Sequence, residues 1–156
     1  MNQTMKQKYI RFVVIGIIFV IGITGYIIEY TRSARLNRDM TRAFDLIAMQ
    51  SELERYFVNH HAYPKAEKAL GAEGITSCSQ EWESLAQTLD ISLPRDPEQN
   101  CSTQFYGYQS DRIEYKIIAF PEICARASAR AFYDPVRPCS SNNGAWMFAS
   151  SGATQW

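Results

Sequence analysis

Three groups of residues in this chain have side chains that can do chemistry: a histidine pair, a glutamate pair and four cysteines. His60 and His61 are adjacent, so on a helix their side chains diverge by about 100°, and no third metal ligand lies near them in the sequence. Glu52 and Glu54 are two residues apart, which places them on different faces of a helix rather than in an acid–base pair. G-x-S-x-G, H-E-x-x-H and glycine-rich phosphate-loop motifs do not occur. We therefore predict no catalytic, cofactor-binding or metal-binding residues, and a protein that is not an enzyme.

The four cysteines favour disulfide bonds. All of them follow a long apolar segment, and no C-x-x-C pair of the zinc-ribbon or thioredoxin type is present. An even number of cysteines in a small domain fits an oxidising compartment, and four unpaired thiols in a reduced domain are the alternative. Four cysteines allow three pairings. We favour Cys78–Cys101, which brackets a short predicted helix, and Cys124–Cys139, which closes the loop after a predicted hairpin.

The N-terminal part of the chain holds one long apolar run. No residue from Phe12 to Ile28 is charged, and with its neighbours the run reaches the roughly 20 residues that a bilayer-spanning helix needs. We expect a cytoplasmic tail at 1–11, a transmembrane helix at 12–30 and one extracytoplasmic domain at 31–156.

Basic residues before the run leave a second interpretation open. Lys6, Lys8 and Arg11 precede it, as in a cleaved secretory signal, although the run exceeds the usual signal core of ~7–15 residues. An arginine at a membrane edge reaches lipid phosphates at little cost, so we expect Arg11 to hold the helix at the cytoplasmic face. Basic residues also follow the run and do not settle orientation. The cysteines do, and they predict an inner-membrane anchor with a periplasmic domain.

The charges after the run alternate in sign. The whole chain has 16 basic and 16 acidic residues and a formal net charge of zero, which argues against nucleic acid as a partner. Arg32, Arg35, Arg38 and Arg42 are interleaved with acidic residues. We expect them to form a solvated helix face rather than a lipid-binding cluster.

The segment 31–60 predicts that the helix continues beyond the membrane. It contains neither glycine nor proline and is rich in good helix formers. The following Tyr63–Pro64 pair is unfavourable for a helix and is expected to stop it. Apolar residues keep helical spacing and form one stripe that drifts into a second: first Leu36, Met40, Ala43 and Ile47, then Leu46, Met49, Leu53, Tyr56 and Phe57.

The rest of the chain predicts a small sheet. Ser79 with the acidic residues after it is a typical start of a short helix. Phe105–Phe120 predicts a hairpin with a tight turn at Asp111–Arg112, and a further strand starts near Ala145. The fold class is α+β: the long helix packs its second stripe under the hairpin strand Ile113–Phe120, on a small antiparallel sheet.

In order along the chain, three stretches carry a family resemblance: TRSARLNRDMTRAFDLIAMQSELERYFVNHHAYP, LPRDP and YGYQSDRIEYKIIAF. Together with the apolar run they resemble the type IV pilin and type II secretion pseudopilin superfamily, most closely the major-pseudopilin type. The resemblance implies a pilin-like fold and a membrane-anchored structural subunit of a type II secretion or type IV pilus-like assembly. Its implied partners are inner-membrane lipid and other pilin-like subunits or secretion-assembly proteins. The alternative is a membrane-tethered binding or accessory domain that does not polymerise.

Two features of that family have no counterpart here. Similar proteins have a short leader that ends in glycine before a phenylalanine, and a glutamate early in the apolar helix. This chain has no glycine before Gly16 and no acidic residue before Glu29, so we expect the first residues to be kept, apart from Met1. Similar proteins also use acidic residues of a C-terminal loop to bind calcium, but no acid follows Asp134 here, so we expect no such site.

Overall fold

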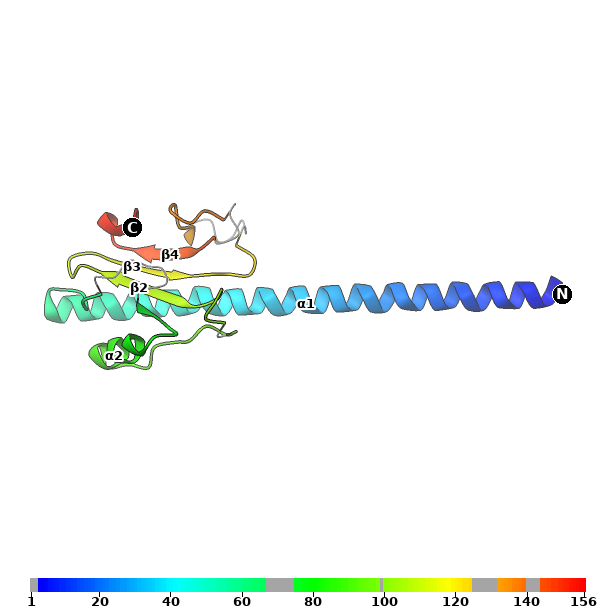
Figure 1. Cartoon of the computed structure of the whole chain (residues 1–156), viewed down its shortest axis with the longest axis horizontal. Helices are drawn as coiled ribbons and strands as arrows, with labels where there is room; N and C mark the ends of the chain where they lie inside the picture. The colour runs from blue at the N-terminus through cyan, green and yellow to red at the C-terminus, as the bar shows by residue number, and fades with distance from the viewer. Residues whose placement is uncertain (1–2, 67–74, 99, 125–131, 140–143) are drawn as a thin grey trace. The chain divides into compact units, whose positions relative to one another are not determined.

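The computed structural model describes residues 3–66, 75–98, 100–124, 132–139 and 144–156. The chain forms two compact units that meet between Asn37 and Arg38, and each unit is described by itself. Helix α1, from Gln3 to His60, contributes residues to both units, and Figure 1 labels it with the other elements.

The first unit consists of the N-terminal part of α1. Its side chains from Arg11 onward are largely exposed. An 18-residue window of this helix has a mean hydropathy of 2.4, and none of that window is buried inside the protein. Within the described residues, α1 is the one helix that is long and apolar enough to span a membrane.

The C-terminal end of α1 lies in the second unit. The helix ends at His60, and His61 adopts the left-handed conformation with φ of 53°. The His61 backbone N–H donates to the Phe57 carbonyl over 2.8 Å, which satisfies one of the last carbonyls of the helix. The chain therefore leaves the helical path at His61, before Pro64 imposes its own restriction.

The second unit has a four-stranded antiparallel sheet in the order β1-β2-β3-β4. The strands are β1 (Ile75–Thr76), β2 (Tyr106–Ser110), β3 (Tyr115–Ala119) and β4 (Trp146–Ala149). Helix α2 (Gln80–Leu89) follows β1, and the 3₁₀ helix η2 (Ser151–Ala153) follows β4. An α+β fold with a long apolar N-terminal helix and a small antiparallel sheet is thus confirmed.

The hairpin differs from its prediction at the turn. Tyr115 pairs with Ser110, so β3 begins two residues after Ile113. The Asp111 side-chain oxygen Oδ1 accepts the backbone N–H groups of Ile113 and Glu114, which holds both residues in the loop. Ile113 is 76% exposed and belongs to the turn rather than to the strand that covers α1.

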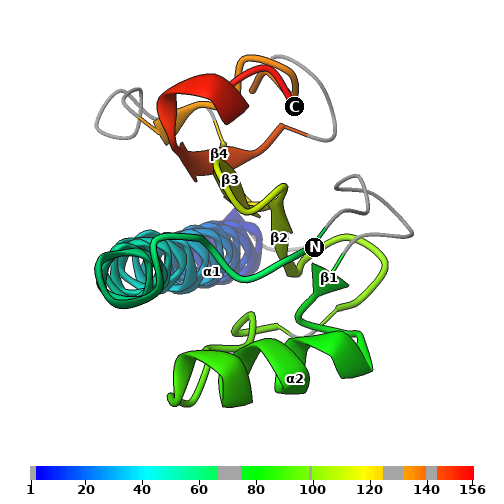
Figure 2. The same ribbon diagram turned by 90° about the vertical axis from the view of Figure 1, so that its left-hand side faces the viewer.

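The core lies between the sheet and two helices. Figure 2 shows residues of α1 along one face of the sheet and α2 beside the β1 edge. α2 buries Trp82, Leu85, Ala86 and Leu89, with Ser79 as its N-cap and Asp90 as its left-handed C-cap. The buried side chains of β2 and β3 that complete this core are Tyr106, Tyr108, Tyr115, Ile117 and Ala119.

Candidate functional site

The two disulfides hold loops at either side of the sheet. Cys78 is bonded to Cys101 and Cys124 to Cys139, with Cα–Cα distances of 5.8 and 5.2 Å. These are the pairs favoured by the sequence. Two disulfides in one small unit indicate an oxidising, extracytoplasmic environment.

The second predicted stripe of α1 does face the sheet. Leu46, Met49 and Leu53, the core-facing set, are at most 2% exposed. Tyr56 and Phe57 are half-buried and pack against the same core. The face that the helix presents to the sheet was therefore correctly predicted over its last turns.

The first predicted stripe runs into that core only in part: Ala43 packs against it, but Met40 and Ile47 do not. Met40 and Ile47 are 49% and 44% exposed, and they lie with Phe44, which is 64% exposed, along the outer side of α1. Met40, Phe44 and Ile47 are spaced four and three residues apart, so they form one continuous helix face. We call these three residues the exposed apolar stripe. The sequence predicted one stripe that drifts into the core-facing one, but Met40 and Ile47 lie on another face, because helical spacing does not distinguish two apolar faces of one helix.

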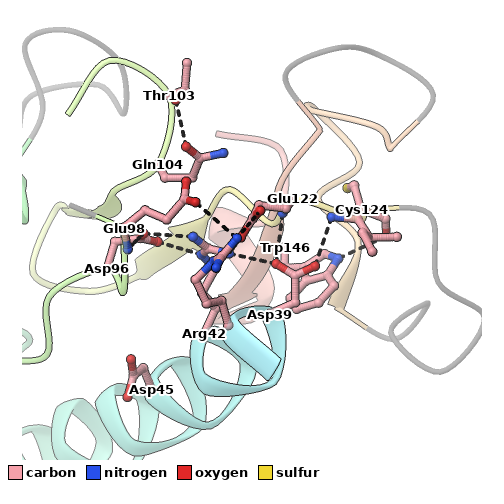
Figure 3. A network of polar contacts seen from close by, with 12 residues as sticks. Asp39, Arg42, Asp45, Asp96, Glu98, Thr103, Gln104, Glu122, Cys124 and Trp146 are labelled. Atoms are coloured by element: carbon pink, nitrogen blue, oxygen red, sulfur yellow. Dashed lines mark hydrogen bonds and ion pairs between the residues drawn. The ribbon is translucent and has the colours of Figure 1, made fainter. Parts of the chain in front are cut away.

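In the first turns of α1 that belong to the second unit, the side of the helix that faces the core has charged side chains instead of apolar ones. We call Arg38, Asp39, Arg42, Asp96, Glu98 and Glu122 the charge network. Figure 3 labels five of these residues, all except Arg38. Arg42 is fully buried at the centre of the network. Its Nε and Nη2 donate to the two Asp96 oxygens over 2.6 and 2.8 Å, and its Nη1 donates to Asp39 over 2.8 Å. Arg42 thus binds Asp96 in the two-pronged geometry that suits a guanidinium.

Asp39 binds the chain that follows the hairpin. Its Oδ1 and Oδ2 accept the backbone N–H groups of Glu122 and Ile123, each over 2.9 Å. The next residue, Cys124, accepts the Trp146 indole N–H at its carbonyl over 3.2 Å. A helix carboxylate, a loop, a disulfide and β4 are therefore connected in one continuous set of contacts.

Arg38 lies at the partly exposed side of the charge network. Its Nε and Nη2 donate to the Glu122 oxygens over 2.6 and 2.7 Å, and its Nη2 lies 3.1 Å from Glu98. Arg42 and Arg38 were predicted to belong to a solvated helix face, and this prediction was wrong. Arg32 and Arg35 are exposed, whereas Arg42 is buried by carboxylates that come from loops distant in the sequence.

The network shifts the pKa of Arg42 and of Glu122. Burial by itself would lower the pKa of Arg42, but hydrogen bonds to Asp96 and Asp39 outweigh it, and the pKa is raised. The hydrogen bond from Arg38 lowers the pKa of Glu122, with a smaller contribution from Arg42. Both shifts favour the charged forms of Arg42 and Glu122, which hold α1 and the loop after the hairpin together.

Tyrosines of the sheet make further polar contacts with α1. The Tyr106 hydroxyl donates to Asp45 over 2.6 Å, and burial raises the pKa of Asp45 although this hydrogen bond opposes the shift. Glu54 accepts hydrogen bonds from the Tyr63 and Tyr115 hydroxyls over 3.1 and 3.0 Å. Burial raises the pKa of Tyr63 to about 12. The sequence analysis did not identify these contacts between tyrosines and carboxylates.

The histidine and glutamate side chains that were considered for metal binding or catalysis make contacts within the fold. His60 stacks on Tyr56 with ring centroids 3.9 Å apart, and its Nδ1 lies 3.0 Å from the Tyr56 carbonyl. Glu52 accepts a hydrogen bond from Arg55 over 2.7 Å, whereas Glu54 contacts the tyrosines on another side of the helix. Among the described residues, no three His, Cys, Asp or Glu side chains are grouped closely enough to hold a metal ion.

Asp134 is occupied by basic partners. The Lys116 ammonium donates to it over 2.9 Å and Arg137 donates to its other oxygen over 2.9 Å. Lys116 and Asp134 are both fully buried, and burial lowers the pKa of Lys116 although the carboxylate opposes this shift. The two cations more than neutralise the Asp134 carboxylate, which leaves it without free negative charge for a divalent cation.

These contacts hold segments of the second unit together around the C-terminal part of α1. The charge network joins α1 to two loops, and the exposed apolar stripe lies on the other side of the same helix. Arg11, predicted at the membrane edge, is exposed at the start of the apolar part of α1. No family model matches the chain, and no curated protein or solved structure is significantly similar to it.

Proposed function

We propose that the protein is a membrane-anchored, pilin-like structural subunit of a type II secretion or type IV pilus-like assembly. The observation that carries the proposal is the exposed apolar stripe. Met40, Phe44 and Ile47 are large apolar residues on a folded unit, and each is at least 44% exposed. A contiguous apolar face of this kind is typical of a surface that contacts another macromolecule.

The location of the stripe supports a subunit contact. It lies on the helix whose N-terminal part is long and apolar enough to span a membrane. Subunits anchored side by side in one membrane present such helices to one another, and apolar helix faces pack by ridges and grooves. In this proposal the helix spans the inner membrane, the N-terminus is cytoplasmic, and the disulfide-bonded unit is periplasmic.

A test is in-cell chemical crosslinking of the tagged full-length protein, followed by pull-down and mass spectrometry. The proposal predicts multimers of this chain, or mixed complexes with other single-span helical subunits. Replacing Phe44 with Gln should reduce these products, whereas replacing the exposed Ile113 with Gln should not. Crosslinked products that contain none of these subunits would refute the proposal.

A second function is favoured by the sequence of the apolar helix. The acidic residue that guides filament assembly in similar proteins has no counterpart before Glu29, and Arg11 stands at the start of the apolar run. A tethered binding or accessory domain that does not polymerise is consistent with both features. One stoichiometric, non-polymeric partner in the crosslinking experiment would favour this second function.

A further inference from the structure

The apolar residues of α1 do not by themselves define one orientation against the sheet. The core-facing set is at most 2% exposed, and the exposed apolar stripe lies nearly opposite to it around the helix. The exposed stripe has three large apolar side chains, and the core side has the core-facing set together with the half-buried Tyr56 and Phe57. Hydrophobic stabilisation follows buried apolar area and has no direction, so the larger set favours the core side but specifies neither an exact rotation nor an axial position of the helix.

The charge network does discriminate between these orientations. Asp39 and Arg42 are fully buried on the core side of α1, in the turns just before Leu46. The two Arg42–Asp96 hydrogen bonds and the two backbone N–H groups held by Asp39 require one rotation and one axial position of the helix. A rotated or shifted helix would leave charges buried without partners, which is far more costly than a modest change in apolar packing.

The loops that carry the partners are fixed by contacts outside α1. The Pro94 carbonyl, next to the Asp96 loop, accepts the Trp82 indole N–H over 3.2 Å. Cys124, two residues after Glu122, is bonded to Cys139. The loops therefore provide a reference position to which the helix must adjust.

We propose that the charge network, rather than the apolar pattern, sets which face of α1 packs on the sheet and at what axial register. The network thereby keeps the exposed apolar stripe on the outside. Fixing register is the best-attested use of buried polar groups in helical packing. This inference concerns the fold of the second unit and does not depend on what contacts the stripe.

The test replaces the buried network with apolar residues of similar size in the full-length protein: Asp39→Leu, Arg42→Met, Asp96→Leu and Glu122→Leu. The tryptophan indole N–H signals, recorded by two-dimensional NMR in detergent micelles, report on the packing. The chain has three tryptophans, and the indoles of Trp82 and Trp146 donate beside the two network loops. The proposal predicts a second set of Trp82 and Trp146 signals, because both orientations become populated.

A matched control and a second variant complete the experiment. Removing the exposed Glu52–Arg55 pair with Glu52→Leu and Arg55→Met should leave three indole signals. Ser51→Leu, which extends the exposed apolar stripe while the network is intact, should also leave three. The proposal is overturned if the network variant keeps three signals at their original positions, because the network would then be irrelevant to register. It is also overturned if this variant loses all dispersed signals, because the network would then be required for folding itself. It is equally overturned if Ser51→Leu alone produces a second set.

Discussion

Leu53 shows how a single side chain stabilises the second unit. It is 1% exposed between α1 and the sheet. Leu53→Ala should lower the free energy of unfolding by about 2–5 kcal/mol, because burial is lost and a cavity remains. Urea unfolding of the full-length protein in detergent, followed by tryptophan fluorescence, measures the change. Val58→Ala, at a residue 70% exposed, is the control and should change stability by less than about 0.5 kcal/mol. Equal effects of the two substitutions would refute this packing.

Glu122 should make stability depend on pH in the acid range. Its pKa in the folded protein is lowered by the hydrogen bonds from Arg38 and Arg42, so it stabilises the fold above its unfolded pKa of about 4.3. That contribution is lost as the pH falls through the lowered folded value. Glu122→Gln should cost about 1.5–3 kcal/mol at pH 7 and progressively less as the pH falls toward 3. A difference in unfolding free energy that stays constant from pH 7 to pH 3 would contradict this assignment.

Single residues differ in how far sequence reasoning could place them. Leu46, Met49 and Leu53 were predictable because helical periodicity and apolar character agree. The partners of Arg42 were not, because Asp96 lies 54 residues away and Glu122 80 residues away. Interleaved charges on a helix usually indicate a face exposed to solvent. No local pattern distinguishes such a face from a buried network whose acidic residues come from distant loops.

At the scale of elements, the end of α1 depends on one residue in an unfavourable conformation. His61 is exposed and has φ of 53°, which costs a non-glycine residue about 1–2 kcal/mol. His61→Gly should therefore raise the free energy of unfolding by about 0.5–1 kcal/mol, after the greater freedom of glycine in the unfolded chain is subtracted. The same urea experiment measures this gain. His60→Gly, inside the helix, should instead be destabilising, and a stabilisation by both changes would refute the role of His61.

Helices and strands with longer sequence patterns were easier to predict than short ones. α1, α2, the hairpin and β4 each carry enough residues for helical or alternating spacing to be recognised. β1 was missed because it has two residues, Ile75 and Thr76, and is defined only by pairing with β2. The start of β3 was displaced because Ile113 has a typical strand side chain, while Asp111 holds its backbone in the turn. Side-chain to backbone bonds of this kind override propensity.

At the scale of the whole molecule, the chain combines a helix long and apolar enough to span a membrane with a disulfide-bonded unit that suits an oxidising compartment. Within the second unit, buried charges on one side of α1 leave an apolar stripe on the other side. An isolated soluble protein gains nothing from keeping Met40, Phe44 and Ile47 in water, whereas a subunit among neighbours buries them on assembly. The proposed function therefore depends on that stripe being a contact surface in the cell.

Site-specific photocrosslinking in living cells tests this dependence most directly. A photoreactive amino acid placed at Phe44, in the full-length protein in its membrane, should crosslink to another copy of this chain or to another single-span helical subunit. The same group at Ile113, which is 76% exposed but lies in the hairpin turn, should give few such products and serves as the control. Crosslinks from Phe44 only to lipid or water, or equal yields at the two positions, would contradict the account.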